Sequence, residues 1–272
     1  MKSIVISVTL CLLMLMPVSS RLTMATGQDG DASLDEAAQK AANPISDVAR
    51  LQIESTYRQY KSGTDQYVIN SEFFLPYDGL IVPGLGAGGR DYLSLLRVET
   101  SMIQQHNSQH GDVDAFGMTD TNIANGVGFP QSWGIWGLGY GILLPTATEK
   151  PLGMGKWQAG PAGLISYLGF PGWQITVFAE QFFSFAGDHN QAPQNFMLFQ
   201  PTVTKLFAGG YFLIFDPQMN FDWKNNDYII PLSLGFGKAL SKSLTFSLQP
   251  EYVVNGSTRG TFAIQLNFTV MP

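Results

Sequence analysis

The sequence predicts an all-β protein, a transmembrane antiparallel up-and-down β-barrel of about 12 strands with a short N-terminal periplasmic arm. Three observations lead to this fold class. Only 13% of the 272 residues are charged, whereas a soluble domain has about 25%. Long segments alternate between apolar and polar residues with a period of two, which is typical of two-faced β-strands. The chain also begins like an exported protein.

Residues 1–25 have the layout of a secretory signal peptide. Lys2 precedes an apolar run, and small residues follow, so we expect cleavage after Ser20 or Ala25. The run is shorter than the roughly 20 apolar residues that a transmembrane helix needs. Cys11, the single cysteine, lies in this run. The mature chain is therefore expected to contain neither disulfides nor thiolate metal sites.

Residues 26–49 differ in composition from the rest. They are polar and rich in alanine up to a break at Asn43 and Pro44. We interpret this segment as a short, exposed, partly helical periplasmic arm. Two roles remain open for it, a mobile linker or a segment that binds a partner. The barrel then occupies residues 50–272.

The alternation is clearest near the C-terminus. Between residues 244 and 254, Leu248 and Tyr252 share an apolar face, while Gln249 and Glu251 share a polar one. Strands of this length reach the 9 to 11 or so residues that cross a bilayer at a tilt. Strands of soluble sandwiches are shorter, about 5 to 6 residues. Strand length therefore favours the membrane.

The same pattern recurs along the body of the chain. It predicts strands near 51–60, 66–76, 91–103, 116–129, 133–145, 156–168, 173–186, 195–206, 211–223, 227–237, 244–254 and 261–270. An even number of strands, typical of single-chain outer-membrane barrels, places both termini at one end. If that end is periplasmic, the short inner turns lie near 130–132, 169–172, 208–210 and 238–243, and the longer outer loops at 104–115, 146–155 and 187–194. Residues 77–89 break this rule as a long inner connection.

Two alternatives to a membrane barrel can be weighed. The uncharged stretches 121–148 and 157–179 could suggest helices, but glycines as frequent as Gly137, Gly139 and Gly141 weaken a helix. A soluble sandwich would explain the strands but not the missing charge. The barrel also explains the aromatic residues expected at the two interfaces, namely Trp133, Trp173 and Tyr211 at inner ends and Trp157, Trp223 and Tyr228 at outer ends.

Several motifs resemble one group of bacterial outer-membrane proteins. The most specific is LLPTATEKPLGMGKWQAGPAG (residues 143–163), followed by FSFAGD (183–188), FQPTV (199–203) and IIPLSLGFGK (229–238). The likeness begins at ANPISDV (42–48) and extends to the last strand. These motifs are similar to those of the neuromedin-U-like or phenol meta-pathway outer-membrane family.

The resemblance implies a monomer-scale barrel that acts as a transporter, with uptake of aromatic compounds in some relatives. The C-terminus departs from the usual pattern, because barrels of this kind often end on an aromatic residue that the barrel-assembly machinery recognises. This chain ends Val270, Met271, Pro272. Either Phe268 supplies that signal or the signal is weak.

The polar faces of the strands are expected to line a lumen. The charges expected to set its selectivity are Arg97, Glu99, Asp216 and Asp222, with Glu54, Arg58, Glu180 and Glu251 as further lumen-facing groups. Carboxylates outnumber guanidinium groups, so an open pore should prefer cations or neutral solutes to anions. Pairs such as Arg97 and Glu99 have an alternative role, in which they only neutralise the interior of a closed barrel.

An enzymatic function is not expected. The three histidines, His106, His110 and His189, fall in the expected outer loops, and neither a GxSxG elbow nor an HExxH helix is present. The segment from His110 to Asp114 could bind a divalent cation, but solvated loop residues explain it better. Ser184 and His189 have a poor spacing for a hydrolase pair. We therefore expect no catalytic residues, no bound metal and no cofactor.

The leading hypothesis is an outer-membrane channel or transporter for small solutes, including hydrophobic or aromatic compounds. The alternatives are a closed structural or surface-binding barrel that acts through its outer loops, and an outer-membrane lipid or peptide hydrolase. The expected partners are outer-membrane lipids, a small-molecule solute and the barrel-assembly machinery. A net charge of −6 and an isoelectric point near 5.0 exclude nucleic acid.

Overall fold

The computed structural model describes residues 28–42, 48–77, 92–107 and 115–272. The chain divides into two compact units after Gly30, and the description below concerns the unit from Asp31 to Pro272. The predicted signal peptide, the Asn43–Pro44 break, most of the inner connection 77–89 and the segment from His110 to Asp114 lie outside the described residues.

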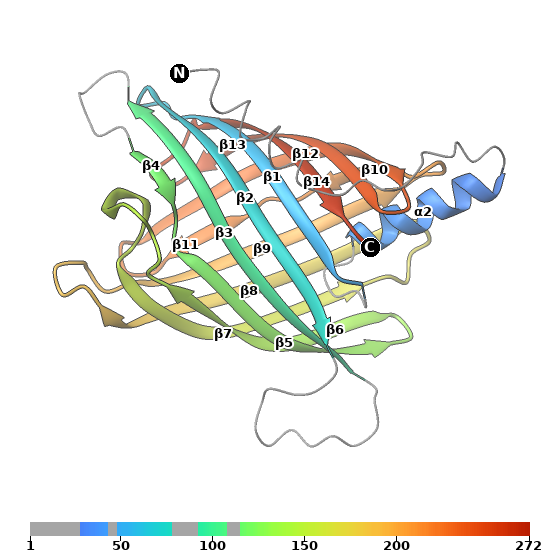
Figure 1. The fold of residues 1–272 in the computed structure, drawn as a ribbon, viewed down its shortest axis with the longest axis horizontal. Coiled ribbons are helices and arrows are strands. Elements are labelled where there is room, and N and C mark those ends of the chain that lie inside the picture. Colours follow the sequence, from blue (N-terminus) through green and yellow to red (C-terminus); the bar gives the residue numbers. More distant parts are fainter. Residues whose placement is uncertain (1–27, 43–47, 78–91, 108–114) are drawn as a thin grey trace. The chain divides into compact units, whose positions relative to one another are not determined.

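Within the described ranges the chain is almost entirely β-sheet (Figure 1). One α-helix, α2 (Gln28–Ala42), and one short 3-10 helix, η1 (Lys150–Leu152), accompany the strands. The strands are β1 (Arg50–Gln59), β2 (Thr64–Tyr77), β3 (Leu93–Asn107), β4 (Ala115–Met118), β5 (Thr121–Gln131), β6 (Gly134–Leu144), β7 (Lys156–Tyr167), β8 (Trp173–Gly187), β9 (Asn195–Leu206), β10 (Tyr211–Phe215), β11 (Met219–Asp222), β12 (Asp227–Ser241), β13 (Leu244–Asn255) and β14 (Phe262–Val270).

These strands form a closed antiparallel barrel. Most strands pair with their neighbours in sequence order, but β4 and β5 both pair with β3, and β10 and β11 both lie between β9 and β12. The pairing of β1 with β14, over nine residues from Leu51 to Gln59, closes the sheet. Two of the predicted strands are interrupted. Segment 116–129 is split at Thr119 into β4 and β5, and segment 211–223 is split at Pro217, which lacks the amide hydrogen that a continuous ladder requires. Twelve crossings result, which confirms the predicted fold class.

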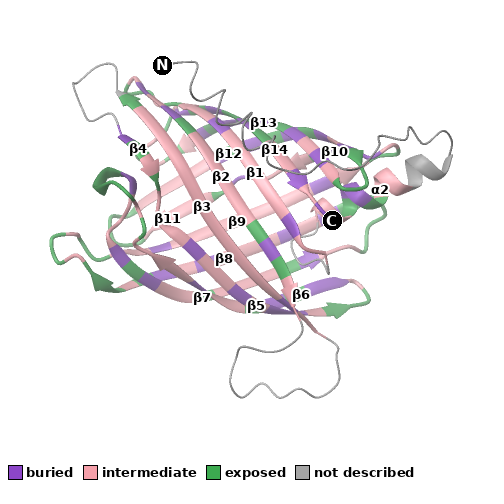
Figure 2. Cartoon of the chain, viewed as in Figure 1, coloured by how far each residue is buried: buried purple, intermediate pink, exposed green. Residues whose placement is uncertain are grey.

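The two faces of the barrel wall have opposite character, as the alternation predicted. On β13, Thr245, Ser247, Gln249 and Glu251 are buried inside the barrel, whereas Tyr252 is exposed on the outside. Figure 2 shows buried residues alternating with intermediate or exposed residues along the strands. Large apolar side chains cover the outside, for example Trp136, Leu138, Phe185, Leu232, Leu234 and Phe236. A closed barrel with an apolar exterior is the architecture of bacterial outer-membrane proteins.

Aromatic and basic side chains gather at the inner ends of the strands. Trp173 and Tyr211 are half-exposed there. The ammonium group of Lys205 lies 4.9 Å from the centre of the Trp173 ring, and that of Lys238 lies 4.2 Å from the centre of the Tyr211 ring. At the outer ends Trp157 and Trp223 are exposed in the same way. This distribution matches the interfacial girdles of membrane barrels.

The connections have the predicted placement where the structure describes them. The inner turns are short: Gln131 pairs with Gly134 across a two-residue turn, and Ser241 with Leu244 across another. The turn between β9 and β10 uses Gly209 and Gly210 with φ of 79° and 72°, a conformation that favours glycine. The connection between β6 and β7, which carries η1, is the longer outer loop that was expected.

Helix α2 packs against the inner end of the barrel. Ala37 and Ala38 are buried against Phe212, Ala239 and Met271. The segment was expected to be partly helical, and it is, but it was also expected to be exposed. Its buried face corrects that expectation, because the two alanine methyl groups fit closely against the barrel wall. In the part of the chain that the structure describes, no helix has both the length and the apolar character needed to cross a membrane.

Polar contacts complete the docking of α2. A carboxylate oxygen of Asp35 accepts a hydrogen bond from the Gly210 amide at 2.7 Å. The Gln174 side-chain amide donates to the carbonyl oxygen of Ala42 at 2.7 Å. A hydrogen bond to a charged group contributes about 1.5 to 3 kcal/mol and a neutral one about 1 kcal/mol. The helix is thus held by a few modest contacts.

The lipid-facing assignment of Leu234, in the middle of β12 and 60% exposed, predicts the effect of Leu234→Arg. A charge at mid-depth in lipid should lower the free energy of unfolding by about 2 to 4 kcal/mol. Urea unfolding in liposomes measures this change. The matched control is Ala192→Arg, in the exposed loop between β8 and β9, which should leave stability nearly unchanged. Equal stability of both variants would contradict the assignment.

Candidate functional site

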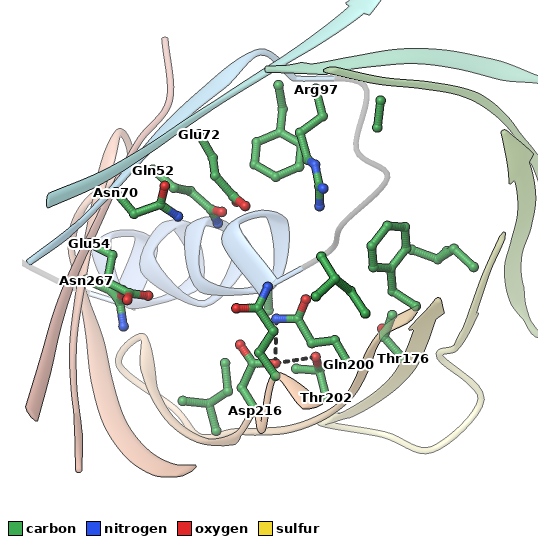
Figure 3. A pocket seen from close by; sticks show the side chains of 18 of the residues that line it. Gln52, Glu54, Asn70, Glu72, Arg97, Thr176, Gln200, Thr202, Asp216 and Asn267 are labelled. Atoms are coloured by element: carbon green, nitrogen blue, oxygen red, sulfur yellow. Dashed lines mark hydrogen bonds between the residues drawn. The ribbon is translucent and has the colours of Figure 1, made fainter. Parts of the chain in front are cut away.

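A cavity of about 510 Å³ occupies the barrel interior. Its lining extends from Ala42 and Thr269 at the inner end to Tyr60 and Thr258 at the outer end. The volume falls in the range of about 300 to 1,000 Å³ that small-molecule sites occupy. Figure 3 shows the side chains that project into it from opposite sides of the wall.

The cavity has two unlike walls. The side formed by β1, β2, β13 and β14 is polar and charged, with Gln52, Glu54, Asn70, Glu72, Ser247, Gln249, Gln265 and Asn267. The side formed by β5 to β10 combines polar side chains, those of Asn125, Thr176, Gln200 and Thr202, with glycines and apolar side chains, including Gly126, Gly139, Leu164, Phe178, Leu198, Phe212 and Ile214. A solute in this cavity therefore meets mainly hydrogen-bonding groups on one side and a mixture of hydrocarbon and hydrogen-bonding groups on the other.

The shortest ion pair among the described lumen residues joins two distant strands. Arg97 on β3 contacts Glu180 on β8 at 3.0 Å and Glu99 on its own strand at 3.4 Å. The Asn122 side chain also donates to Glu180 at 3.0 Å. Strands β5, β6 and β7 separate β3 from β8 in the sheet, so the Arg97–Glu180 pair spans a concave part of the wall. From the sequence we expected Arg97 to pair with Glu99, but not with Glu180.

Glycine makes this long contact possible. A Cβ atom on Gly141 would lie 1.9 Å from Oε1 of Glu180. Any larger residue at position 141 would therefore displace the carboxylate. Glu180 has no exposed surface, and a buried charge without its partner costs several kcal/mol, of the order of 3 to 5. The small wall residues and the ion pair thus depend on each other.

Further hydrogen bonds extend from Glu99 along the polar wall. The Asn70 side-chain nitrogen donates a hydrogen bond to Glu99 at 3.1 Å. The Ser101 hydroxyl donates one to the side-chain oxygen of Asn70 at 3.0 Å. Closer to the outer end, Arg58 contacts Glu251 at 3.6 Å. Glu99, Arg58 and Glu251 therefore each have an oppositely charged partner.

Three cavity carboxylates have no ion pair among the described residues. Glu54 accepts a hydrogen bond from the Thr56 hydroxyl at 2.7 Å. Asp216, on the opposite wall, accepts from the Thr202 hydroxyl at 2.6 Å and from Gln200 at 3.0 Å, as the dashed lines in Figure 3 show. Glu72 is the third, and its side chain points into the cavity in the same view.

Two charged residues that line the cavity were not predicted from the sequence. Arg50, the first residue of β1, lies with its guanidinium carbon 4.0 Å from the centre of the Phe74 ring. Glu72 pairs in register with Gln52 and Glu99. Counting by two from Arg50 through Gln52 to Glu54 would have found the first residue, and the alternation of β2 would have found the second.

The eight lumen residues expected from the sequence have different positions. Glu54, Arg58, Arg97, Asp216 and Glu251 line the cavity, and Glu99 and Glu180 contact Arg97. Asp222 is elsewhere, at the end of β11, where its carboxylate accepts hydrogen bonds from the backbone amides of Lys224 and Asn225, both at 2.9 Å. The alternation continues to Asp222, but the strand ends there and the side chain closes a turn.

The residues considered for a hydrolase do not come together. The Ser184 hydroxyl accepts a hydrogen bond from the Gln194 amide at 2.8 Å. His189 and His106 are exposed. Asp188, beside His189, accepts hydrogen bonds from the backbone amide and side chain of Asn190, which lower the pKa of its carboxyl group. Within the described ranges no group of three or more potential ligands could hold a metal ion.

Together the fold and the lumen define an outer-membrane β-barrel with a polar internal cavity. No family model and no curated protein matches the chain, so the family suggested by the sequence motifs stays a prediction. Solved structures do match. An outer membrane channel from Pseudomonas putida F1 superposes with a TM-score of 0.65 at 10% identity, covering 92% of this chain and 100% of the channel. The NanC porin superposes with a TM-score of 0.51 at 8% identity, covering 81% and 98%. At these identities the likeness establishes the fold.

The Gly141 contact predicts a difference between two glycine variants. Gly141→Ala should displace Glu180 and lower the free energy of unfolding by about 1 to 3 kcal/mol. Gly163→Ala is the matched control, because its added Cβ would meet its nearest atoms at 3.7 and 3.9 Å, ordinary contact distances. Urea unfolding of both variants in the same lipid tests the prediction. An equal loss of stability in the two would show that Glu180 does not depend on Gly141.

Proposed function

We propose that the barrel is a passive outer-membrane channel for small solutes and that its lumen prefers cations to anions. The observation that carries the proposal is the cavity itself, whose lining reaches both ends of the barrel and contains three carboxylates that form no ion pair among the described residues. The likeness of the fold to an outer membrane channel and to a porin supports a channel. It adds no support for a particular solute.

The charge balance supports the cation preference. The cavity is lined by four carboxylates, Glu54, Glu72, Asp216 and Glu251, and Arg97 brings Glu99 and Glu180. Among the described residues, three guanidinium groups that line the cavity, those of Arg50, Arg58 and Arg97, oppose these six acids. At about 8 Å one charge contributes about 0.5 kcal/mol in water and about 2 kcal/mol at an effective dielectric constant of about 20. The excess acid therefore stabilises a permeating cation relative to an anion.

The unlike walls support solutes that have an apolar part. Phe178, Leu164, Leu198 and Ile214 offer hydrocarbon contact opposite the polar wall. A solute with an apolar face and a neutral or cationic polar group would be complementary to both sides.

The selectivity test removes single carboxylates while it keeps their shape. Asp216→Asn and Glu72→Gln should each lower the ratio of cation to anion permeability by about twofold or more, and the double variant should lower it further. Reversal potentials across a bilayer in a salt gradient measure this ratio. Asp222→Asn is the matched control, since Asp222 closes a turn and its loss should leave the ratio unchanged.

Two results would overturn the assignment. Unchanged reversal potentials for both lumen variants would show that Asp216 and Glu72 do not set the selectivity. A change as large in Asp222→Asn would place the selectivity at the outer mouth. If the wild-type barrel folds but stays closed in bilayers and in liposome flux assays, the alternative of a barrel acting through its outer loops would replace the channel.

A further inference from the structure

Helix α2 forms part of the cavity wall at its inner opening. Ala41 and Ala42 line the cavity together with Thr245 and Thr269, which lie at the inner ends of β13 and β14. Figure 3 shows the ribbon of the helix across the lumen, behind the labelled side chains. A solute that enters or leaves at this end must pass the C-terminal end of α2.

The surface between α2 and the barrel is small and made of small groups. Its buried part consists of Ala37 and Ala38, with Leu34 and Ala41 partly buried at its edge. Gly210 lets the helix come this close, because a Cβ atom there would lie 2.9 Å from the Cβ atom of Leu34. So few buried side chains hold the helix in place but allow it to dissociate from the barrel.

Charges act on the docked helix in two directions: Lys242 attracts Glu36, whereas the lumen repels the helix end. Residues 31–42 contain three acidic residues, Asp31, Asp35 and Glu36, and one basic residue, Lys40. The C-terminal end of a helix also has a partial negative charge, and here it adjoins a lumen with excess carboxylates. A helix of about 15 residues is marginally stable alone in water. Once undocked, α2 would therefore unfold readily and clear the opening.

We propose that α2 is a displaceable plug of the inner mouth that restricts flow while docked and opens the channel when it leaves. The inference rests on the proposed channel function. Because α2 is negatively charged, a potential that is positive on the inner side should pull it away from the barrel. The open probability should therefore depend on the sign of the voltage.

Two neighbouring substitutions in the full-length chain test the plug. Ala38→Glu puts a carboxylate on the buried face of α2, where Ala38 is 1% exposed, and should undock the helix. Gln39→Glu adds the same charge at the next residue, which is exposed, and is the matched control. Single-channel recordings should show a several-fold higher open probability and a weaker voltage asymmetry for Ala38→Glu, and wild-type behaviour for Gln39→Glu.

A disulfide tests the opposite direction and does not depend on the folding of Ala38→Glu. The Cβ atoms of Leu34 and Ala239 lie 2.9 and 3.0 Å from the same point, the Cβ position built on Gly210, and therefore within 5.9 Å of each other. A small movement of the helix would bring cysteines there to the roughly 3.5 to 4.5 Å between Cβ atoms that a disulfide needs. The double variant Leu34→Cys, Ala239→Cys should close when oxidised and recover when dithiothreitol is added. Leu34→Cys alone is its control.

The two proposals fail in different ways. If Ala38→Glu matches Gln39→Glu and the oxidised pair conducts like the reduced pair, α2 is a fixed structural element and the plug is refuted, while the channel stands. If the oxidised, the reduced and the Ala38→Glu barrels are all folded and all silent, the channel function itself is refuted. In each case, a shift in electrophoretic migration on heating shows that the barrel was folded.

Discussion

The rest of the structure depends on the closure of the sheet through the pairing of β1 with β14. In a bilayer every backbone amide and carbonyl group must find a partner within the protein, and a β-sheet meets this condition only when it has no free edge. Closure in turn fixes the side of the wall on which each residue lies. A shift of one residue would turn Glu54 and Glu251 toward lipid and Leu248 inward.

Closure also forces the polar face into a confined space, where its charges must be accommodated. Arg97 connects Glu99 and Glu180, and Gly141 gives Glu180 the room to reach it. On the other side of the lumen, Asp216 is held by neutral donors alone. Full pairing of every charge would produce a neutral interior. The incomplete pairing observed gives the lumen its excess of negative charge.

The sequence predicted the features that depend on local alternation. Strand positions, the polar lumen row and the aromatic residues at strand ends all follow from the period of two, which one strand displays by itself. Contacts between distant strands could not be predicted in this way. The partner of Arg97 is Glu180, 83 residues further along the chain, and only the curvature of the closed sheet brings them together.

The positions of Asp222 and of helix α2 were predicted wrongly, and each error has a local physical cause. Asp222 continues the alternation of its segment, but the strand ends at that residue and its carboxylate accepts backbone hydrogen bonds in the turn. The docking of α2 was hidden because alanines such as Ala37 and Ala38 give a weak amphipathic pattern in sequence. Their fit depends on the shape of the inner mouth, which no single segment of the sequence specifies.

The most direct test of the central claim is the current through the refolded wild-type barrel in a planar bilayer with unequal potassium chloride concentrations on the two sides. The account predicts discrete openings and a reversal potential displaced toward that of the cation, because the excess carboxylates stabilise cations in the lumen. A reversal potential displaced toward that of chloride, or a folded barrel that never conducts, would contradict it.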